Sequence, residues 1–316
     1  MAELSAGSWV LWPLFIMLCV SLCAAGCPCT DPRLCEPITD SRDFEVLVFY
    51  TKGKNWKFYD WSQVTTIALF GKYDPELLCF AHSKGARLVL KGDVPLPYIV
   101  DLKNRTSWIT QKVELAKSQF MDGINLDIEQ SVLKGSPEYY ALTALVEETT
   151  EAFHREIPGS QVTFDVAWSP DCVDERCYNY TGIAESCDFL FVMSYDEQSQ
   201  IWTECVASAN SPLNKTLSGY QKFTQLDIDP KKLVMGVPWY GYDYPCLDLE
   251  KKKDAKGQFH QVWYDDPVSI SLKSAYIKKL GLRGIGMWNG DLLDYSQDPI
   301  AETQTKDMWN ALKGVG

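Results

Sequence analysis

Short, nearly continuous apolar runs recur along the chain and alternate with longer, more polar stretches. The runs lie at 44–50, 64–71, 86–93, 122–129, 161–168, 187–196, 232–241 and 282–291. Apolar runs of this length are typical of parallel strands buried on both faces. Helical spacing of apolar residues appears at 107–120, 137–157, 269–280 and 298–313. This alternation predicts an α/β fold of the (β/α)8 TIM-barrel type.

An open, doubly wound sheet is the competing architecture for such an alternation. A nucleotide-binding sheet of that kind carries a glycine-rich turn after its first strand, and no such turn follows residues 44–50. The chain has 316 residues, which suits one barrel. We therefore predict a single catalytic domain over residues 26–316.

The fourth run, DGINLDIE at 122–129, places acids inside an apolar segment. Side chains alternate between two faces along a strand. One face is apolar and the other is polar: Ile124, Leu126 and Ile128 form the first, and Gly123, Asn125, Asp127 and Glu129 form the second. In a barrel the polar face points into the interior, and Glu129 comes last, nearest the C-terminal rim where barrel active sites form.

Asp127 and Glu129 lie two residues apart on one face, so their carboxylates repel each other. Repulsion and partial burial both disfavour the charged forms, and we expect a raised pKa for at least one of the two. A raised pKa suits Glu129 to act as a general acid. A structural polar cluster is one alternative. A calcium-binding loop is another, but its sixth position requires glycine, and Asp127 stands there.

Charge and composition narrow the class of ligand. The formal net charge of −12 argues against a nucleic-acid partner. The 11 Trp and 16 Tyr leave aromatic side chains for a binding surface. The three His are scattered and no cluster has metal-ligand spacing, so we expect no metal and no other cofactor.

The N-terminal region predicts entry into the secretory pathway. Residues 9–25 form an uncharged apolar run that ends in small residues, so we predict a signal peptide over residues 1–25 and no membrane segment after its cleavage. No basic residue precedes the run, and a signal anchor is the alternative.

Cysteines and glycosylation sequons agree with that compartment. Cys19 and Cys23 fall in the predicted signal, so nine of the 11 cysteines remain, and an odd number leaves one thiol unpaired. The cluster of Cys27, Cys29 and Cys35 predicts disulfides; the alternative, a zinc site, has no neighbouring His. Three sequons predict N-glycosylation at Asn104, Asn179 and Asn214.

Four motifs resemble glycoside hydrolase family 18, the chitinase-type barrels. DGINLDIE resembles the family's fourth-strand signature, Asp-Gly-x-Asp-x-Asp-x-Glu. MSYD at 193–196, GVPWYG at 236–241 and GMWNGD at 286–291 resemble its sixth, seventh and eighth strands. Within the family, SKGARLVLKGD, VAWSPD and YDEQSQIW are most similar to lysosomal members that trim the chitobiose core of N-glycans.

The resemblance implies retaining, substrate-assisted hydrolysis of a GlcNAc-β-1,4-GlcNAc bond. It implies that Glu129 protonates the leaving oxygen, that Asp127 orients the acetamido group and that Tyr195 hydrogen-bonds its oxygen. Further substrate contacts are implied for Asn125, Met193, Asp196, Trp239, Tyr240 and Trp288. Trp288 would form the sugar platform, and a position in the core is its alternative. The implied partner is an N-glycan-derived or chitin-like oligosaccharide, bound by a monomer in the lysosome.

The sequence departs from the family pattern in three places. Asn125 stands where the family usually has a third Asp that shares a proton with its neighbour, so we expect an altered pH profile without loss of the chemistry. VLKGD at 89–93 replaces a Ser-x-Gly-Gly turn. A short charged linker, 247–258, stands where relatives of this kind carry a long α+β insertion, so we expect one wall of the cleft to be missing and Cys246 to lack its partner.

Three kinds of function remain open on the sequence. The first is the hydrolase, the second is a non-catalytic glycan-binding protein on the same fold, and the third is an inactive short isoform. The joint presence of Glu129, Asp127 and Tyr195 favours the hydrolase.

Overall fold

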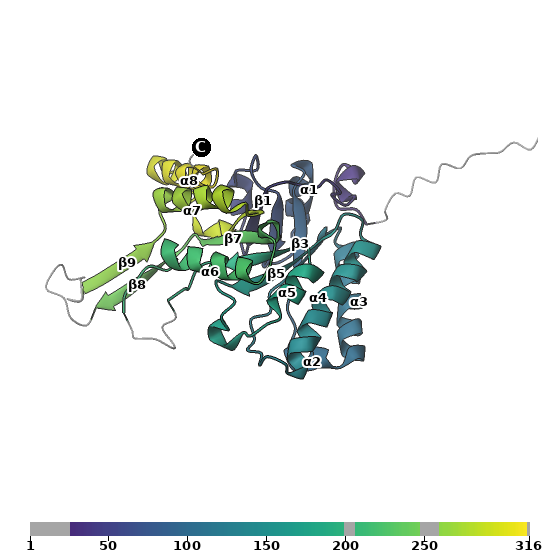
Figure 1. Ribbon diagram of the computed structural model, residues 1–316. Helices are drawn as coiled ribbons and strands as arrows, with labels where there is room; N and C mark the ends of the chain where they lie inside the picture. Colours follow the sequence, from purple (N-terminus) through teal and green to yellow (C-terminus); the bar gives the residue numbers. More distant parts are fainter. Residues whose placement is uncertain (1–25, 199–205, 247–258, 315–316) are drawn as a thin grey trace, which may run out of the picture.

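Eight parallel strands close into a barrel (Figure 1). The computed structural model describes residues 26–198, 206–246 and 259–314. The barrel strands are β1 (Glu45–Tyr50), β2 (Thr66–Leu69), β3 (Arg87–Gly92), β4 (Gly123–Leu126), β5 (Gln161–Ala167), β6 (Phe189–Met193), β7 (Leu233–Pro238) and β10 (Gly284–Trp288). They pair in the order β1-β10-β7-β6-β5-β4-β3-β2. The predicted (β/α)8 barrel is confirmed, and each predicted apolar run contains one barrel strand.

Helices surround the barrel (Figure 1). They are α1 (Pro75–Ser83), α2 (Leu96–Val100), α3 (Leu102–Ser118), α4 (Pro137–Glu156), α5 (Tyr180–Ser186), α6 (Leu213–Gln225), α7 (Pro267–Leu280) and α8 (Pro299–Ala311). The four predicted helices correspond to α3, α4, α7 and α8. The others escaped prediction because α1, α2 and α5 are short, and because the buried face of α6 is built from Thr, Gly, Tyr and Phe rather than from aliphatic residues.

Two apolar layers hold the barrel together. The outer layer, between strands and helices, includes Ile124, Leu126 and Ile128. The inner layer fills the barrel and consists of Leu47, Phe49, Ala68, Val89, Phe189, Phe191, Tyr195 and Val234. The strand β4 therefore turns its apolar face outward, as the alternation predicted.

The strand β4 is shorter than predicted. It ends at Leu126, so Asp127 and Glu129 lie in the segment just beyond it. The Asp127 amide still donates to the Gly92 carbonyl at 2.8 Å, but β3 ends at Gly92 and offers no further partner. The alternation of burial nevertheless continues, because Ile128 is buried while Asp127 and Glu129 are partly or largely exposed.

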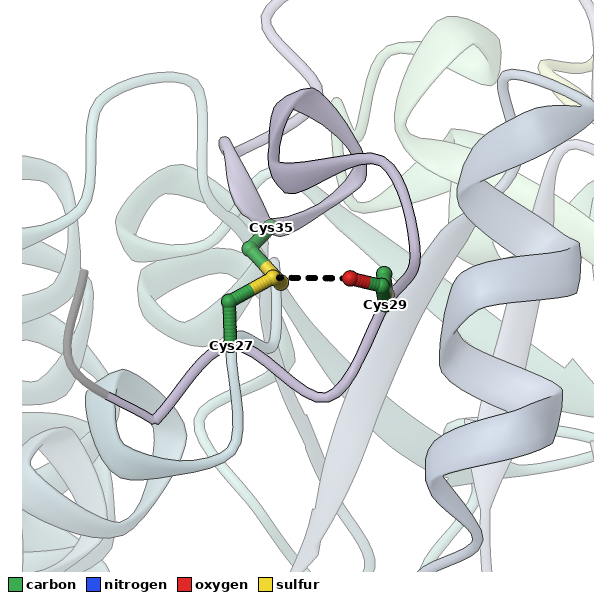
Figure 2. A group of neighbouring side chains, drawn as sticks. All are labelled: Cys27, Cys29 and Cys35. Carbon is green, nitrogen blue, oxygen red and sulfur yellow. Dashed lines mark hydrogen bonds between the residues drawn. A yellow bond between two sulfur atoms is a disulfide. The ribbon is translucent and has the colours of Figure 1, made fainter. Parts of the chain in front are cut away.

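Disulfides fasten the N-terminal segment. Cys27 bonds to Cys35 and Cys29 bonds to Cys79, and Figure 2 shows Cys27, Cys29 and Cys35 together. Their sulfurs all lie within 4.8 Å of one another, which is the spacing of a metal site. Each sulfur is already in an S–S bond, so the predicted disulfides are confirmed and the zinc alternative is wrong.

One further disulfide joins Cys172 and Cys177. Cys187 is a buried free cysteine in the described part of the chain. Burial raises the pKa of the Cys187 thiol to about 12, so it stays protonated and unreactive. Cys187 supplies an unpaired thiol that an odd number of cysteines requires. The side chain of Cys246 lies outside the described residues, so the expectation about its partner does too.

Two strands absent from the sequence prediction project from the barrel after β7 (Figure 1). They are β8 (Gly241–Cys246) and β9 (Phe259–Tyr264), and they pair antiparallel. The sequence predicted only a charged loop here, although aromatic and β-branched residues, which favour strands, stand on both sides of the linker. The linker itself, 247–258, lies outside the described residues, as does the predicted signal peptide. No helix in the described ranges is long and apolar enough to cross a membrane.

Candidate active site

A cleft of about 210 Å³ opens at the carboxyl ends of the barrel strands. Several of the residues predicted to act on substrate line it together: Asp127, Glu129, Met193, Tyr195, Asp196, Tyr240 and Trp288. They come from the ends of β4, β6, β7 and β10, which are far apart in the sequence. This is the rim at which barrel enzymes place their catalytic groups.

Glu129 stands at the edge of the cleft with its side chain half exposed. Its Oε2 accepts a hydrogen bond from Arg176 Nη1 at 2.8 Å. Partial burial and the neighbouring Asp127 carboxylate raise the pKa of Glu129, although Arg176 opposes them. Glu129 therefore keeps a proton at a higher pH than an ordinary glutamate, as a general acid must.

Asp127 lies deeper than Glu129, with 14% of its side chain exposed. The Lys91 ammonium is 3.3 Å from its carboxylate and also pairs with Asp93. Burial alone would lower the pKa of Lys91, but the two carboxylates outweigh it and raise that pKa. Lys91 is therefore a fixed positive charge beside Asp127, and it comes from the VLKGD segment that departs from the family pattern.

Asp165, on β5, forms the floor of the cleft and is fully buried. Its Oδ1 accepts a hydrogen bond from Asn125 Nδ2 at 2.7 Å, and the same amide group reaches Thr163 Oγ1 at 2.9 Å. Burial and the charge of Asp127 raise the pKa of Asp165 well above its usual range. This shift favours the protonated form of Asp165, and Asn125 contacts Asp165 rather than the open space.

Tyrosines from the ends of β6 and β7 also line the cleft. Tyr195 is 8% exposed and packs against Tyr240 with 6.1 Å between ring centres. Asp196 accepts hydrogen bonds from the hydroxyls of Tyr240, at 2.6 Å, and Tyr242, at 2.5 Å. Because Tyr242 belongs to β8, the projecting hairpin is fastened to the cleft through Asp196.

The two predicted tryptophan contacts differ in location. Trp288 lines the cleft and packs edge-on against Phe49 and Phe70, at 5.3 and 5.4 Å between ring centres. Trp239 is 5% exposed and packs on Trp309 at 4.9 Å. Strand alternation explains where Trp239 lies, since Met235, Val237 and Trp239 pack in the outer layer while Val234 and Tyr240 lie on the inner side. The structure thus places Trp239 in the outer layer, away from this cleft.

Sequence reasoning missed Lys91, Asp165 and Arg176 as parts of the site. Asp165 carried a usable signal, because alternation along β5 puts Thr163, Asp165 and Ala167 on one inward face. Lys91 follows from the same argument applied to β3. Arg176 lies in a loop without periodicity, and only the contact with Glu129 reveals it.

The predicted glycosylation sites differ in their surroundings. Asn214 is exposed in the first turn of α6, and Asn104 is half buried in the first turn of α3. Asn179 caps α5, accepting a hydrogen bond from the Gly182 amide at 3.3 Å. Glycosylation of these three residues stays a prediction.

Comparisons with known proteins agree with this geometry. The model of Glycosyl hydrolases family 18 matches residues 96–292. Di-N-acetylchitobiase from Mus musculus is 57% identical over 95% of this chain and 96% of its own length. Di-N-acetylchitobiase from Homo sapiens is 57% identical over 92% of this chain and 89% of its own length. The alignment with the mouse protein spans 352 positions, more than the 316 residues of this chain, so that relative contains residues without a counterpart in this chain.

The fold recurs in solved structures of low sequence similarity. A crystal structure of a chitinase from Chromobacterium violaceum superposes with a TM-score of 0.69 at 17% identity, covering 85% of this chain and 98% of that one. At this level of identity the likeness concerns the barrel alone.

Proposed function

Because the chain belongs to glycosyl hydrolases family 18, we propose that this glycosidase cleaves the GlcNAc-β-1,4-GlcNAc bond of the chitobiose core of N-linked oligosaccharides. The observation that carries the proposal is the meeting of Asp127, Glu129 and Tyr195 in one cleft, with the pKa of Glu129 raised. The names of the relatives, di-N-acetylchitobiases, support the choice of bond.

In the first step the substrate's own acetamido group replaces an enzyme nucleophile. Its carbonyl oxygen attacks the anomeric carbon, and the bond to the leaving sugar breaks as Glu129 donates its proton to the departing oxygen. An oxazolinium ion remains in the cleft. Asp127 orients the acetamido group and stabilises the positive charge on its nitrogen, and Tyr195 donates a hydrogen bond to the acetamido oxygen.

In the second step water opens the oxazolinium ion. Glu129, now ionised, accepts a proton from the water as the water oxygen bonds to the anomeric carbon. The bond from that carbon to the acetamido oxygen breaks and the amide re-forms. Two successive inversions give net retention, and Glu129 regains its proton. Trp288 offers the apolar face for the sugar ring, while Met193, Asp196 and Tyr240 shape the pocket around it.

The direct test is release of GlcNAc from a chitobiose-containing oligosaccharide by the purified protein at acid pH. We expect turnover, and we expect inhibition by a thiazoline that mimics the cyclised intermediate, because an active site binds the intermediate more tightly than the substrate. A substrate analogue with a 2-hydroxyl in place of the acetamido group should be inert. Hydrolysis of that analogue would exclude the substrate-assisted mechanism.

The same assay separates the alternatives. A glycan-binding protein without catalysis would bind chitobiose oligosaccharides, measured by calorimetry, but would release no GlcNAc. An inactive isoform would do neither. The joint positions of Asp127 and Glu129 favour the enzyme over both, because a binding protein has no need of a carboxyl group with a raised pKa.

We also propose that the protein enters the secretory pathway by a signal peptide over residues 1–25 and acts as a monomer in the lysosome. The disulfides support an extracellular or lumenal location. Expression in mammalian cells, followed by glycosidase digestion and microscopy with a lysosomal marker, tests this route. We expect the wild-type protein to lose mass when its N-glycans are digested. The triple variant Asn104→Gln, Asn179→Gln and Asn214→Gln should lose none.

The short linker at 247–258 leads to a further expectation about binding. Loops after barrel strands build the rim of the site, whereas Glu129, Tyr195 and Trp288 come from other strands. We infer that this chain keeps the residues that cleave the bond. We also infer that it binds weakly the sugars other than the one whose anomeric carbon reacts. A chimera with the longer segment of a relative should show a lower KM at similar kcat; equal KM values would contradict this inference.

A further inference from the structure

Arg176 is the cation nearest the predicted acid, and its surroundings hold it there. Its Nη1 donates to Glu129 at 2.8 Å, its Nη2 donates to Asp174 at 3.0 Å and its Nε reaches the Val173 carbonyl at 3.4 Å. The side chain is largely buried, with 9% exposed. Three directions of the guanidinium are thus engaged, which leaves Arg176 little freedom to turn away from Glu129.

The loop that carries Arg176 is fastened to the segment that carries Glu129. The Val132 amide donates to the Glu175 carbonyl at 2.9 Å, and the Cys177 amide donates to the Val132 carbonyl at 3.2 Å. The Tyr178 hydroxyl lies 2.8 Å from the Ile128 carbonyl and 2.7 Å from the Gln130 carbonyl. These contacts flank Glu129 in sequence, so the loop and the acid share one rigid frame.

The backbone of this loop is held in an unusual conformation. Cys172, Asp174 and Glu175 have φ of 53°, 51° and 62°, values that cost free energy for residues other than glycine. The Cys172–Cys177 disulfide closes the same segment. Such a conformation persists only where its surroundings enforce it, and here it delivers the guanidinium to the acid.

Glu129 lies among negatively charged groups that oppose its ionisation, and Arg176 is the cation in contact with it. Acidic and phenolic groups surround Glu129 from several elements: Asp127 after β4, Asp165 on β5, Asp174 in the loop, Tyr178 before α5 and Tyr195 after β6. Two cations offset these groups: Arg176, which contacts Glu129, and Lys91 on β3, which lies beside Asp127. Without Arg176, Glu129 would have no cation in contact with it among the described residues, because Lys91 pairs with Asp127 and Asp93.

We propose that Arg176 is a positioning residue for the general acid, which fixes the direction of the Glu129 side chain and supplies the counter-charge that lets it release and regain its proton within one cycle. The inference rests on the proposed function, because it assigns Arg176 a task in that reaction. When the proton leaves Glu129 in the first step, Arg176 stabilises the resulting carboxylate without moving. The acid is therefore regenerated by water in the second step at the same place.

The decisive experiment is the pH profile of kcat/KM for Arg176→Gln. Removal of the positive charge should raise the pKa of Glu129, so that the acid stays protonated to higher pH and the alkaline limb moves up by about one pH unit. Loss of the fixed direction should lower kcat about tenfold. An unmoved alkaline limb together with an unchanged kcat overturns the proposal.

Two further variants separate charge from geometry and carry the test if Arg176→Gln does not fold. Arg176→Lys keeps the charge but loses the planar fork, so the alkaline limb should stay near that of the wild type while kcat falls several-fold. Asp174→Asn removes a negative charge near the acid, so the limb should move to lower pH. A limb that moves upward in Asp174→Asn contradicts the role as counter-charge.

A readout without substrate distinguishes this proposal from the proposed function. Carbon-13 NMR of glutamate-labelled free protein, with Glu129→Gln to assign the signal, gives the pKa of Glu129 in wild type and in Arg176→Gln. A raised value in the variant supports the inference even if the wild type were inert towards chitobiose; equal values reject it even if the enzyme is active. Arg155→Gln, which removes an exposed arginine on α4, is the control and should change neither measurement.

Discussion

Two buried acids, one near each end of β4, differ in the hydrogen-bond donors that surround them. At its start, Asp122 is fully buried and receives the Ile38 amide at 2.9 Å, the Leu88 amide at 2.8 Å and His82 Nε2 at 2.8 Å. Beside its other end, on the neighbouring strand β5, Asp165 is equally buried but receives one hydrogen bond from the side chains that the structure describes, from Asn125. Equal burial therefore leaves the two acids with very different numbers of hydrogen-bond donors.

The difference follows from where donors are available. At the start of β4, incoming chain segments bring backbone amides and a histidine to one carboxylate, which satisfies it. At the rim, burial and the charge of Asp127 raise the pKa values of Glu129 and Asp165. The same stretch, residues 122–129, thus supplies a structural anchor at one end and proton chemistry at the other.

Glu129→Gln should produce the largest effect and should confine it to the rim. The amide keeps the shape of the side chain but carries no transferable proton, so turnover should fall by a factor of about 10²–10⁴. Steady-state kinetics and thermal unfolding would be measured together. Glu147→Gln, an exposed glutamate on α4, is the control; similar loss in both variants would show that the effect does not come from the acid.

Asp122→Ala should do the reverse, lowering stability while the folded fraction keeps its activity. Its removal leaves buried donors and His82 without their partner, which typically costs about 3–5 kcal/mol in a buried pair. Urea unfolding gives the free energy, and active-site titration with a tight inhibitor gives the folded fraction. A normal free energy of unfolding with a lower kcat would contradict the contrast between the two ends.

The pair of His82 and Asp122 should make stability depend on pH. Burial alone would lower the pKa of His82, but the hydrogen bond to Asp122 and its charge outweigh burial and raise it. The stabilisation is complete below the ordinary histidine pKa of about 6.5 and is lost as the pH rises through the folded-state pKa. The difference in Tm between wild type and His82→Gln should therefore be larger at acid pH than at alkaline pH.

His154 provides a matched comparison for that experiment. Its hydrogen bond to Asp188 also raises its pKa, but the side chain is 45% exposed. Solvent screening should make the pH-dependent effect of His154→Gln smaller. Equal effects in the two variants would mean that burial does not strengthen the His82 pair.

Asn125→Asp should have the smallest effect and bears on the rim alone. It would place another carboxyl group against Asp165, where the Asn125 amide now donates. The added negative charge disfavours ionisation of its neighbours, so we expect the alkaline limb of the rate profile to move to higher pH with a few-fold change in kcat. A profile that superposes on the wild type would show that Asn125 is electrostatically silent.

Periodicity predicted most of the barrel because its strands are apolar on both faces. The position of Glu129 at the rim followed from alternation along residues 122–129, even though β4 ends three residues earlier. Strand ends depend on the neighbouring strand, here the end of β3 at Gly92, and one strand's own sequence does not contain that information.

Residues that act through tertiary contacts were out of reach. Arg176 meets Glu129 only because a loop folds back over the end of β4. The β8–β9 pair depends on two segments separated by the linker. Each of these rests on pairing between distant segments, for which a single sequence carries no local pattern.

The N-terminal segment, which disulfides and the Ile38–Asp122 hydrogen bond fasten to the barrel, constrains the order of events during synthesis. The Ile38 amide bonds to Asp122, which lies 84 residues later in the chain. At a synthesis rate of about 5–20 residues per second, Asp122 is made roughly 4–17 seconds after Ile38. Throughout the early part of that interval Cys27, Cys29 and Cys35 are together while Cys79 has yet to be translated, so an oxidant can join Cys29 to the wrong neighbour. We therefore expect the yield of active protein from a living cell to depend on its capacity to exchange disulfides.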